Sequence, residues 1–385
     1  MSEASSSFRG PRALLPLLVL SFCLPVAARA EGTPTDGGTP APLASPEPTT
    51  AALSRDALAA LEQRILGPGC EPKLLGDAAR SFIEAQLLCD AHLSFILIQA
   101  TLDGQPVPDT QRRLKALLAD ALGRARRPFN AQKGTRVAGH TLPHSVLYRG
   151  YVLLMVAGME RAGLADAEST ALFDALAAQL VEALSRQLLL PSFGRTIWPC
   201  DSAPAAAGLL LHGRLRGNAD SRAAGERLVA RLLELADLPT GFPAKVDAKG
   251  RLVEPTQRGT TLAWTGAFLG MAAHPAARRF TATLVDGYCG HPAGSALPLA
   301  ACREWPRGVK GPEDSASGPL VFGGYSLGAS ALAIAATRLS GEHGQWHLHL
   351  LNAAREMGIR DIVDHPGKRP LEASLHGWGT TVRPW

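Results

Sequence analysis

Hydrophobic residues recur at intervals of three and four along most of the chain, and alternating runs of β-branched residues are scarce. This spacing places apolar side chains on one face of a helix, so the pattern predicts an all-α fold. The predicted helices lie at 52–66, 76–101, 109–126, 145–163, 166–190, 202–216, 219–236, 260–273, 275–288, 317–340 and 344–358.

The predicted helices are of two kinds. Those that open at Ser145, Ser202, Thr260 and Ser317 are rich in Gly, Ala and Leu and nearly free of charge, whereas intervening ones such as "ESTALFDALAAQLVEALSRQ" keep a charged face. A helix without a charged stripe is covered on all sides, and an amphipathic helix faces solvent. The alternation predicts an α/α toroid of roughly five to six helical hairpins, with an inner and an outer ring.

Two stretches depart from this alternation. "FPAKVDAKGRLVEP" predicts a small β-hairpin that turns at Lys249-Gly250. Ser315–Thr337 carries no charge and is long enough for a membrane span. Because Pro319 and Gly323-Gly324 interrupt it and the rest is rich in Ala, we interpret it as an inner toroid helix.

The N-terminal residues predict export. Arg9 and Arg12 precede the apolar run "ALLPLLVLSFCLPVA", and "ARA" ends at Ala30. This order is typical of a secretory signal peptide at residues 1–30, which leaves a periplasmic or extracellular protein with no stable membrane span after cleavage. Residues 31–50 are rich in Pro, Gly and Thr and predict a disordered linker. Residues 51–385 are then a single toroid domain.

Charge narrows the possible partners. The formal charge of +5 falls to +3 when the signal peptide, with three Arg and one Glu, is removed. The basic residues are scattered, and "RARR" at 124–127 is their densest run, which is too weak for a nucleic-acid footprint. We therefore expect a small-molecule substrate and no nucleic acid, and we leave a homo-oligomer open.

Five cysteines remain after processing, so at least one thiol is left over in an exported protein. The distances in sequence between the cysteines suggest the pairs Cys70–Cys89 and Cys289–Cys302, with Cys200 unpaired, although sequence alone does not fix the connectivity.

The unpaired cysteine stands in "WPCDSAPAAAGLLLHG", where Cys200, Asp201 and Ser202 open an inner helix. One interpretation is structural, with Asp201 or Ser202 as the N-cap. The other is functional: a helix N-terminus lowers the pKa of a thiol and Asp201 raises it, so the pair can share a proton and serve as general acid and base.

A second junction, "GHTLPHSVLYRG", adds further candidates. His144 is a possible proton shuttle because its pKa lies near neutrality, or it or Ser145 caps the helix. The hydroxyl of Tyr148 can point into a pocket at the end of the toroid. Arg149 needs a carboxylate, for which Asp201 or Asp314 is available. No HExxH or paired-cysteine spacing exists, so no metal is expected.

Four junctions resemble the linalool dehydratase/isomerase family. They are "SVLYRGYVLLMVAGMERAG", "WPCDSAPAAAGLLLHGRLRGNAD", "GRLVEPTQRGTTLAWTGAFLGMAAHP" and "SASGPLVFGGYSLGASALAIAATRLSGE", in the same order, over roughly residues 145–358. The resemblance implies an α/α toroid that adds, removes or shifts hydroxyl groups on a small branched alkenol without metal or cofactor. Cys200 matches one of the two pocket cysteines of that family and Tyr148 matches its tyrosine. Its histidine is Tyr151 here, and its second cysteine has no counterpart in "LLLPSFGRTIW".

These observations lead to one function and two alternatives. The first is a cofactor-independent lyase or isomerase on a small, largely apolar hydroxylated molecule. The second is a six-hairpin glycoside hydrolase or polysaccharide lyase that uses Asp201 with Glu254 or Asp314, with Trp198, Trp264, Trp305 and Trp378 as possible stacking platforms. The third is a toroid that binds a ligand without catalysis. The residues expected in catalysis are Cys200, Asp201, Tyr148 and His144. Those expected to bind substrate are Tyr151, Trp198, Trp264, Arg258, Asp314 and Tyr325.

Overall fold

The computed structural model describes residues 53–70, 82–129, 133–292, 299–314, 316–357 and 359–385. The predicted signal peptide and linker lie outside the described residues. Residues 50–385 form one compact unit, and the described part of it is mostly helical, as the sequence predicts.

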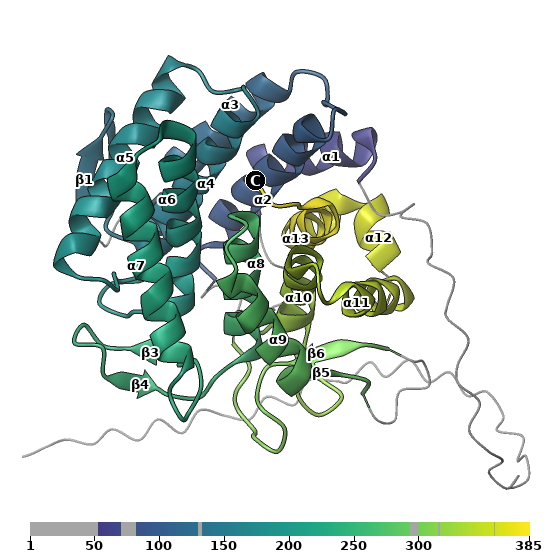
Figure 1. Ribbon diagram of the computed structural model, residues 1–385. Coiled ribbons are helices and arrows are strands. Elements are labelled where there is room, and N and C mark those ends of the chain that lie inside the picture. The colour runs from purple at the N-terminus through teal and green to yellow at the C-terminus, as the bar shows by residue number, and fades with distance from the viewer. Residues whose placement is uncertain (1–52, 71–81, 130–132, 293–298, 315, 358) are drawn as a thin grey trace, which may run out of the picture. The chain divides into compact units, whose positions relative to one another are not determined.

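Six helices form a closed inner ring (Figure 1). They are α2 (Ala85–Leu102), α4 (Val146–Arg161), α6 (Ala203–Arg216), α8 (Gly259–Met271), α10 (Leu327–Ser340) and α13 (Pro370–Thr381). Each packs against the next, and α13 packs against α2, so the ring closes without a gap. This closure confirms the predicted toroid.

A second set of helices lies outside the ring, each against an inner helix that neighbours it in sequence. These are α1 (Arg55–Leu66), α3 (Thr110–Leu122), α5 (Ala167–Arg186), α7 (Ala219–Ala236), α9 (Ala276–Tyr288) and α11 (Gly344–Glu356). A short helix, α12 (Ile359–Asp364), connects α11 to α13. Their charged faces lie in solvent, and this is why their sequences are amphipathic.

The inner helices are apolar because they are buried. Helix α2 is long and apolar enough by length and composition to cross a membrane, yet 78% of it is buried within the protein. Small residues let neighbouring inner helices approach closely. A Cβ atom at Gly150 on α4 would lie 2.6 Å from the backbone nitrogen of Ala205 on α6, so only glycine fits there.

The strands are short and lie in the loops. β1 (Gly134–Val137) pairs with β2 (His140–Pro143), a hairpin that the sequence analysis missed. β3 (Lys245–Val246) pairs with β4 (Leu252–Glu254), which confirms the predicted hairpin. A four-stranded sheet joins β5 (Cys289–Gly290), β6 (Ala301–Arg303), β8 (Tyr325–Ser326) and β7 (Leu320–Val321).

Two predicted helix starts are wrong, and one helix was missed. The helix expected at 76–101 begins at Ala85 within the described residues. The helix expected from residue 317 begins only at Leu327, because Gly323 and Gly324 take positive φ angles and turn residues 320–326 into the β7–β8 hairpin. No helix is predicted beyond residue 358, yet the C-terminal segment contains α13, the sixth inner helix, with Pro370 at its first position.

The cysteine prediction is confirmed. Cys70 is bonded to Cys89 and Cys289 to Cys302, and Cys200 is a free, buried thiol. The second disulfide joins residues that face each other on β5 and β6.

Candidate active site

A cavity of about 480 Å³ lies at one end of the inner ring. Five inner helices contribute to it through residues at or near their N-terminal ends, and α13 contributes from its middle: Glu84, Leu147, Asp201, Thr260 and Gly328, with Leu375 from α13. Loops that precede these helices complete the wall. Since every N-terminus carries a partial positive charge, this end of the ring is the one that favours negatively charged groups.

The cavity brings together most of the residues that the sequence singled out. Six of them line it: Trp198, Cys200, Asp201, Arg258, Trp264 and Asp314. They come from junctions more than a hundred residues apart in the chain. The loops that precede several inner helices therefore converge on one cavity.

Two residues expected in catalysis lie elsewhere. The hydroxyl of Tyr148 donates to the backbone carbonyl of Ala121, 2.9 Å away at the end of α3, so it points outward from the ring. His144 follows the β1–β2 hairpin, and its Nε2 lies 2.9 Å from the hydroxyl of Thr135. Neither side chain lines the cavity.

Two residues expected to bind substrate are also absent from the cavity wall. Tyr151 is fully buried behind Trp264, with ring centroids 5.8 Å apart. Tyr325 lies on β8, where the guanidinium of Arg303 packs over its ring. Tyr151 therefore supports the cavity wall from behind, and Tyr325 belongs to the small sheet.

The expected ion pair of Arg149 is not formed. Its guanidinium donates to the carbonyl oxygens of Pro143, at 2.8 Å, and Leu142, at 3.3 Å. Burial lowers the pKa of Arg149 to about 10. The residue ties the β2 strand to α4 instead of linking two junctions.

Asp201 is a carboxyl group with an elevated pKa. It is 8% exposed, and burial raises its pKa to about 7, against an opposing hydrogen bond from Ser192. The thiol of Cys200 donates to its Oδ1 over 3.8 Å. At neutral pH this group is therefore poised between its protonated and ionised forms.

Cys200 does not behave as predicted for a thiol at a helix N-terminus. Its pKa lies well above the usual value because the side chain is buried and Asp201 adds a negative charge beside it. The expected side-chain cap is also missing. The 3₁₀ turn Pro199–Ser202 runs directly into α6, so Ala203 donates to the carbonyl of Cys200 and neither Asp201 nor Ser202 caps the helix.

Glu84 is the important residue that the sequence analysis missed. It immediately precedes α2 and lines the cavity. Burial, together with the charges of Asp201 and Asp314, raises its pKa to about 8. No motif surrounds it, and the predicted helix at 76–101 placed it inside the helix instead of at its start.

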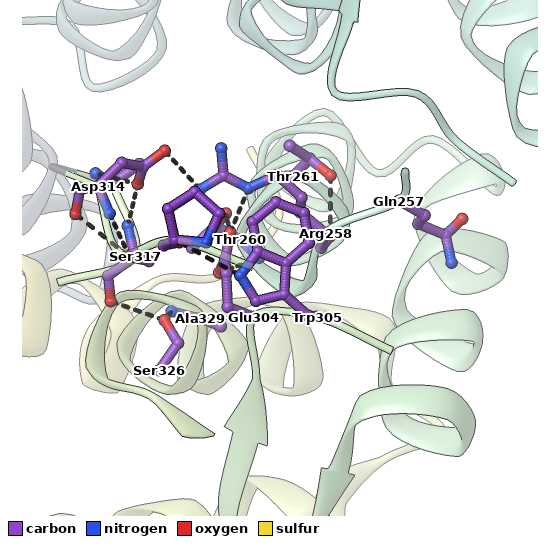
Figure 2. A network of polar contacts seen from close by, with 12 residues as sticks. Gln257, Arg258, Thr260, Thr261, Glu304, Trp305, Asp314, Ser317, Ser326 and Ala329 are labelled. Atoms are coloured by element: carbon purple, nitrogen blue, oxygen red, sulfur yellow. Dashed lines mark hydrogen bonds and ion pairs between the residues drawn. The ribbon is translucent and has the colours of Figure 1, made fainter. Parts of the chain in front are cut away.

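Arg258 organises a network of polar contacts at the cavity (Figure 2). Its Nε lies 2.5 Å from Oε1 of Glu304, and its Nη2 lies 2.6 Å from Oδ2 of Asp314. Glu304, fully buried, also accepts a hydrogen bond of 2.7 Å from the hydroxyl of Thr260. The indole rings of Trp198 and Trp305 both lie against the guanidinium. This network holds Arg258 and Asp314 rigidly at the cavity.

Backbone packing fixes the position of this network. The N–H of Gly259 donates to the carbonyl of Glu304 over 2.8 Å. A Cβ atom at residue 259 would lie 1.9 Å from the carbonyl oxygen of Arg303, so glycine is required where α8 meets β6. The start of α8 is thereby fixed against the segment that carries Glu304.

The other carboxylate proposed for a glycan-cleaving pair, Glu254, does not line the cavity. It forms an ion pair of 2.8 Å with Lys245, which does. Of the four proposed stacking tryptophans, Trp198 and Trp264 line the cavity. Trp305 packs on Arg258, and Trp378 is buried in the centre of the ring. Within the described ranges, no three His, Cys, Asp or Glu side chains gather as a metal site would require.

Comparisons with known proteins add little. No protein family and no curated protein matches the sequence. Among solved structures, the chain is similar to a family 76 glycoside hydrolase from a bovine Bacteroides thetaiotaomicron strain, with a TM-score of 0.48 and 10% identity over 86% of this chain and 78% of that one.

Proposed function

We propose that this protein is an acid/base enzyme that cleaves a glycosidic bond in a short glycan, with Glu84 as general acid and Asp201 as general base. The observation that carries the proposal is that both carboxyl groups line one cavity and have pKa values raised to about 8 and about 7. Two carboxyl groups with separated pKa values in one pocket are the usual basis of glycoside cleavage.

The order of the two pKa values sets the roles. Between pH 7 and 8, Glu84 is mostly protonated and Asp201 is mostly ionised. Glu84 then transfers a proton to the departing glycosidic oxygen as the bond to the anomeric carbon breaks. Asp201 takes a proton from the water that adds to that carbon, so the reaction is a hydrolysis.

The rest of the wall suits a hydroxylated substrate. Trp198 and Trp264 offer flat apolar faces, on which sugar rings stack. Lys245 and Arg258 supply hydrogen-bond donors, and the ammonium of Lys245 lies 4.3 Å from the centre of the Trp198 ring. Asp314, paired with Arg258, supplies an acceptor.

Export is part of the proposal. Cys70–Cys89 and Cys289–Cys302 are disulfides, which persist in oxidising compartments. Together with the predicted signal peptide, they support an enzyme that meets its glycan in the periplasm or outside the cell.

The test is activity against a panel of nitrophenyl glycosides and oligosaccharides, with the variants Glu84→Gln and Asp201→Asn. We expect kcat/KM to be bell-shaped in pH, rising as Asp201 loses its proton near 7 and falling as Glu84 loses its proton near 8. Each variant should lower kcat by about 10²–10⁴-fold, because it removes one proton-transfer step.

Glu226→Gln is the matched control, since Glu226 pairs with His274 on the outer surface, away from the cavity. It should retain wild-type activity. Full activity of Glu84→Gln or Asp201→Asn on a cleaved substrate would contradict the assignment. If no glycan is cleaved but one binds, the toroid is a binding module.

A second function is favoured by Cys200. A free thiol lines the cavity beside Asp201, and Leu88, Leu147 and Leu332 form an apolar wall. This combination suits a lyase or isomerase on a small hydroxylated hydrocarbon, as the resemblance to linalool dehydratase/isomerase implies. Cys200→Ala separates the two functions: it should abolish alkenol conversion, measured by gas chromatography, and leave glycoside cleavage within about threefold, because a neutral thiol takes no part in that proton transfer.

A further inference from the structure

A second cavity of about 270 Å³ lies between α10, α11, α12 and α13. Its wall is mostly aliphatic and includes Ile334, Leu350, Met357, Ile362 and Leu371. We call this cavity the apolar chamber. It exceeds the roughly 150 Å³ that suffices to bind benzene in an apolar cavity, so it has room for a hydrocarbon group of at least that size.

The apolar chamber adjoins the catalytic cavity. Phe82, Ala316, Gly328 and Leu375 line both cavities, so these four residues form a shared wall. A molecule whose reacting group lies beside Glu84 and Asp201 therefore lies next to the chamber, across the side chains that the two cavities share.

The polar groups of the chamber fit an uncharged apolar guest with one polar end. His376 lines it, and burial lowers its pKa to about 4, so the imidazole is neutral near pH 7. Its Nε2 is buried and has no hydrogen-bond partner within the part of the chain that the structure describes. The charged side chains of the wall, Arg369 and Glu372, are only half-buried.

We propose that the apolar chamber is a substrate subsite that holds an alkyl or small branched hydrocarbon group attached to the sugar, so that the substrate class is an alkyl or terpenyl glycoside. This inference rests on the proposed glycosidase function. It also accounts for an aliphatic chamber beside a cavity lined by carboxylates and tryptophans.

Binding is tested without turnover by isothermal titration of the mature protein with 1-butanol, 1-hexanol and 1-octanol. Each added methylene should tighten Kd about fourfold until the chamber is full, because it removes apolar surface from water. Ala354→Phe, which fills the chamber from α11, and Ala331→Leu, which fills it from α10, should each weaken octanol binding at least tenfold. Ala223→Phe, on the exposed face of α7, is the matched control and should bind as the wild type does.

The link to catalysis is tested on the sugar that the panel identifies. The octyl glycoside should have a higher kcat/KM than the methyl glycoside, mainly because its KM is lower. Ala354→Phe should reduce the preference for the octyl over the methyl glycoside. If alkanol affinity were independent of chain length, or equal in Ala354→Phe and wild type, the proposal that the chamber is a subsite would be wrong.

The two proposals fail separately. If octanol binds as expected but Glu84→Gln retains full activity, the catalytic assignment is wrong and the chamber stands as a ligand site. If Glu84→Gln is inactive but methyl and octyl glycosides are cleaved equally well, the catalytic assignment stands and the chamber is not a substrate subsite.

Discussion

Cys200 shows how burial outweighs a favourable position in the chain. The start of an inner helix favours the thiolate, yet the side chain is only 6% exposed and lies against Asp201. Both burial and the neighbouring carboxylate raise the pKa of the thiol. Cys200 is thus a neutral hydrogen-bond donor to Asp201, not a nucleophile.

This assignment predicts the alkylation behaviour of the unreduced protein. At pH 8 Cys200 should resist iodoacetamide in the native state and become the labelled residue after unfolding in guanidinium, as measured by peptide mass spectrometry. Asp201→Asn should label faster than wild type because the variant removes the charge that raises the pKa of the thiol.

Glu226→Gln, which changes a carboxylate far from the thiol, should label at the wild-type rate. Rapid native labelling of Cys200 would contradict a buried neutral thiol and would favour the lyase or isomerase function.

The sequence identified only part of the site at the residue scale. Cys200, Asp201 and Trp198 were found because reactive and aromatic residues cluster in one short loop. Glu84 was missed because its importance depends on α2 closing the ring beside α4 and α13, a contact between segments nearly three hundred residues apart. Tyr148 was wrongly included because helical spacing alone does not tell which face of α4 meets α3.

At the scale of elements, the junction between α8 and the small sheet depends on one buried arginine. Arg258 is 2% exposed and forms ion pairs with both Glu304, which is fully buried, and Asp314. A buried charge that loses its partner is strongly destabilising, whereas removing both charges often is not.

Arg258→Met should therefore lower the free energy of unfolding by about 3–5 kcal/mol, because Glu304 remains buried without a cation. The double variant Arg258→Met/Glu304→Gln should recover a large part of this loss. The measurement is urea denaturation followed by circular dichroism.

Arg279→Met is the control for this pair of variants. Arg279 pairs with Asp237 where both side chains are about half exposed, so its loss should cost less than about 1 kcal/mol. If Arg258→Met and Arg279→Met lowered the free energy of unfolding equally, the Arg258 network would stabilise the protein no more than a surface ion pair does.

Elements with a repeating pattern were predictable, and elements set by local backbone geometry were not. The outer helices and most inner helices follow from the spacing and charge of their residues. The start of α10 does not, because the β7–β8 hairpin depends on positive φ angles at Phe322, Gly323 and Gly324 and on pairing with β6. Helix α13 was missed because "LEASLHGWGTT" has neither the length nor the composition of the other inner helices.

At the scale of the whole molecule, ring closure joins segments from both ends of the described chain. Trp385 is 5% exposed, and its backbone N–H donates to the carbonyl of Met271 over 2.7 Å. Its indole Nε1 donates to Oε1 of Gln99 over 3.1 Å, and its carbonyl oxygen accepts from Arg214 over 2.8 Å. One residue therefore contacts α2, α6 and the end of α8, three members of the inner ring.

Trp385→Ala should consequently destabilise the entire toroid and not only the tail. Losing the buried ring, which also packs edge-on against Phe95 with centroids 5.4 Å apart, should cost about 3–5 kcal/mol. The variant should still unfold in one cooperative transition, at a lower urea midpoint, because the ring has no free edge from which part of it can separate. Trp346→Ala, on the outer helix α11 and half-buried, should cost at most about half as much. If the two variants lose equal stability, or if Trp385→Ala unfolds in two steps with α13 first, closure of the ring would not depend on this residue, and α13 would be an appendage to a ring of five.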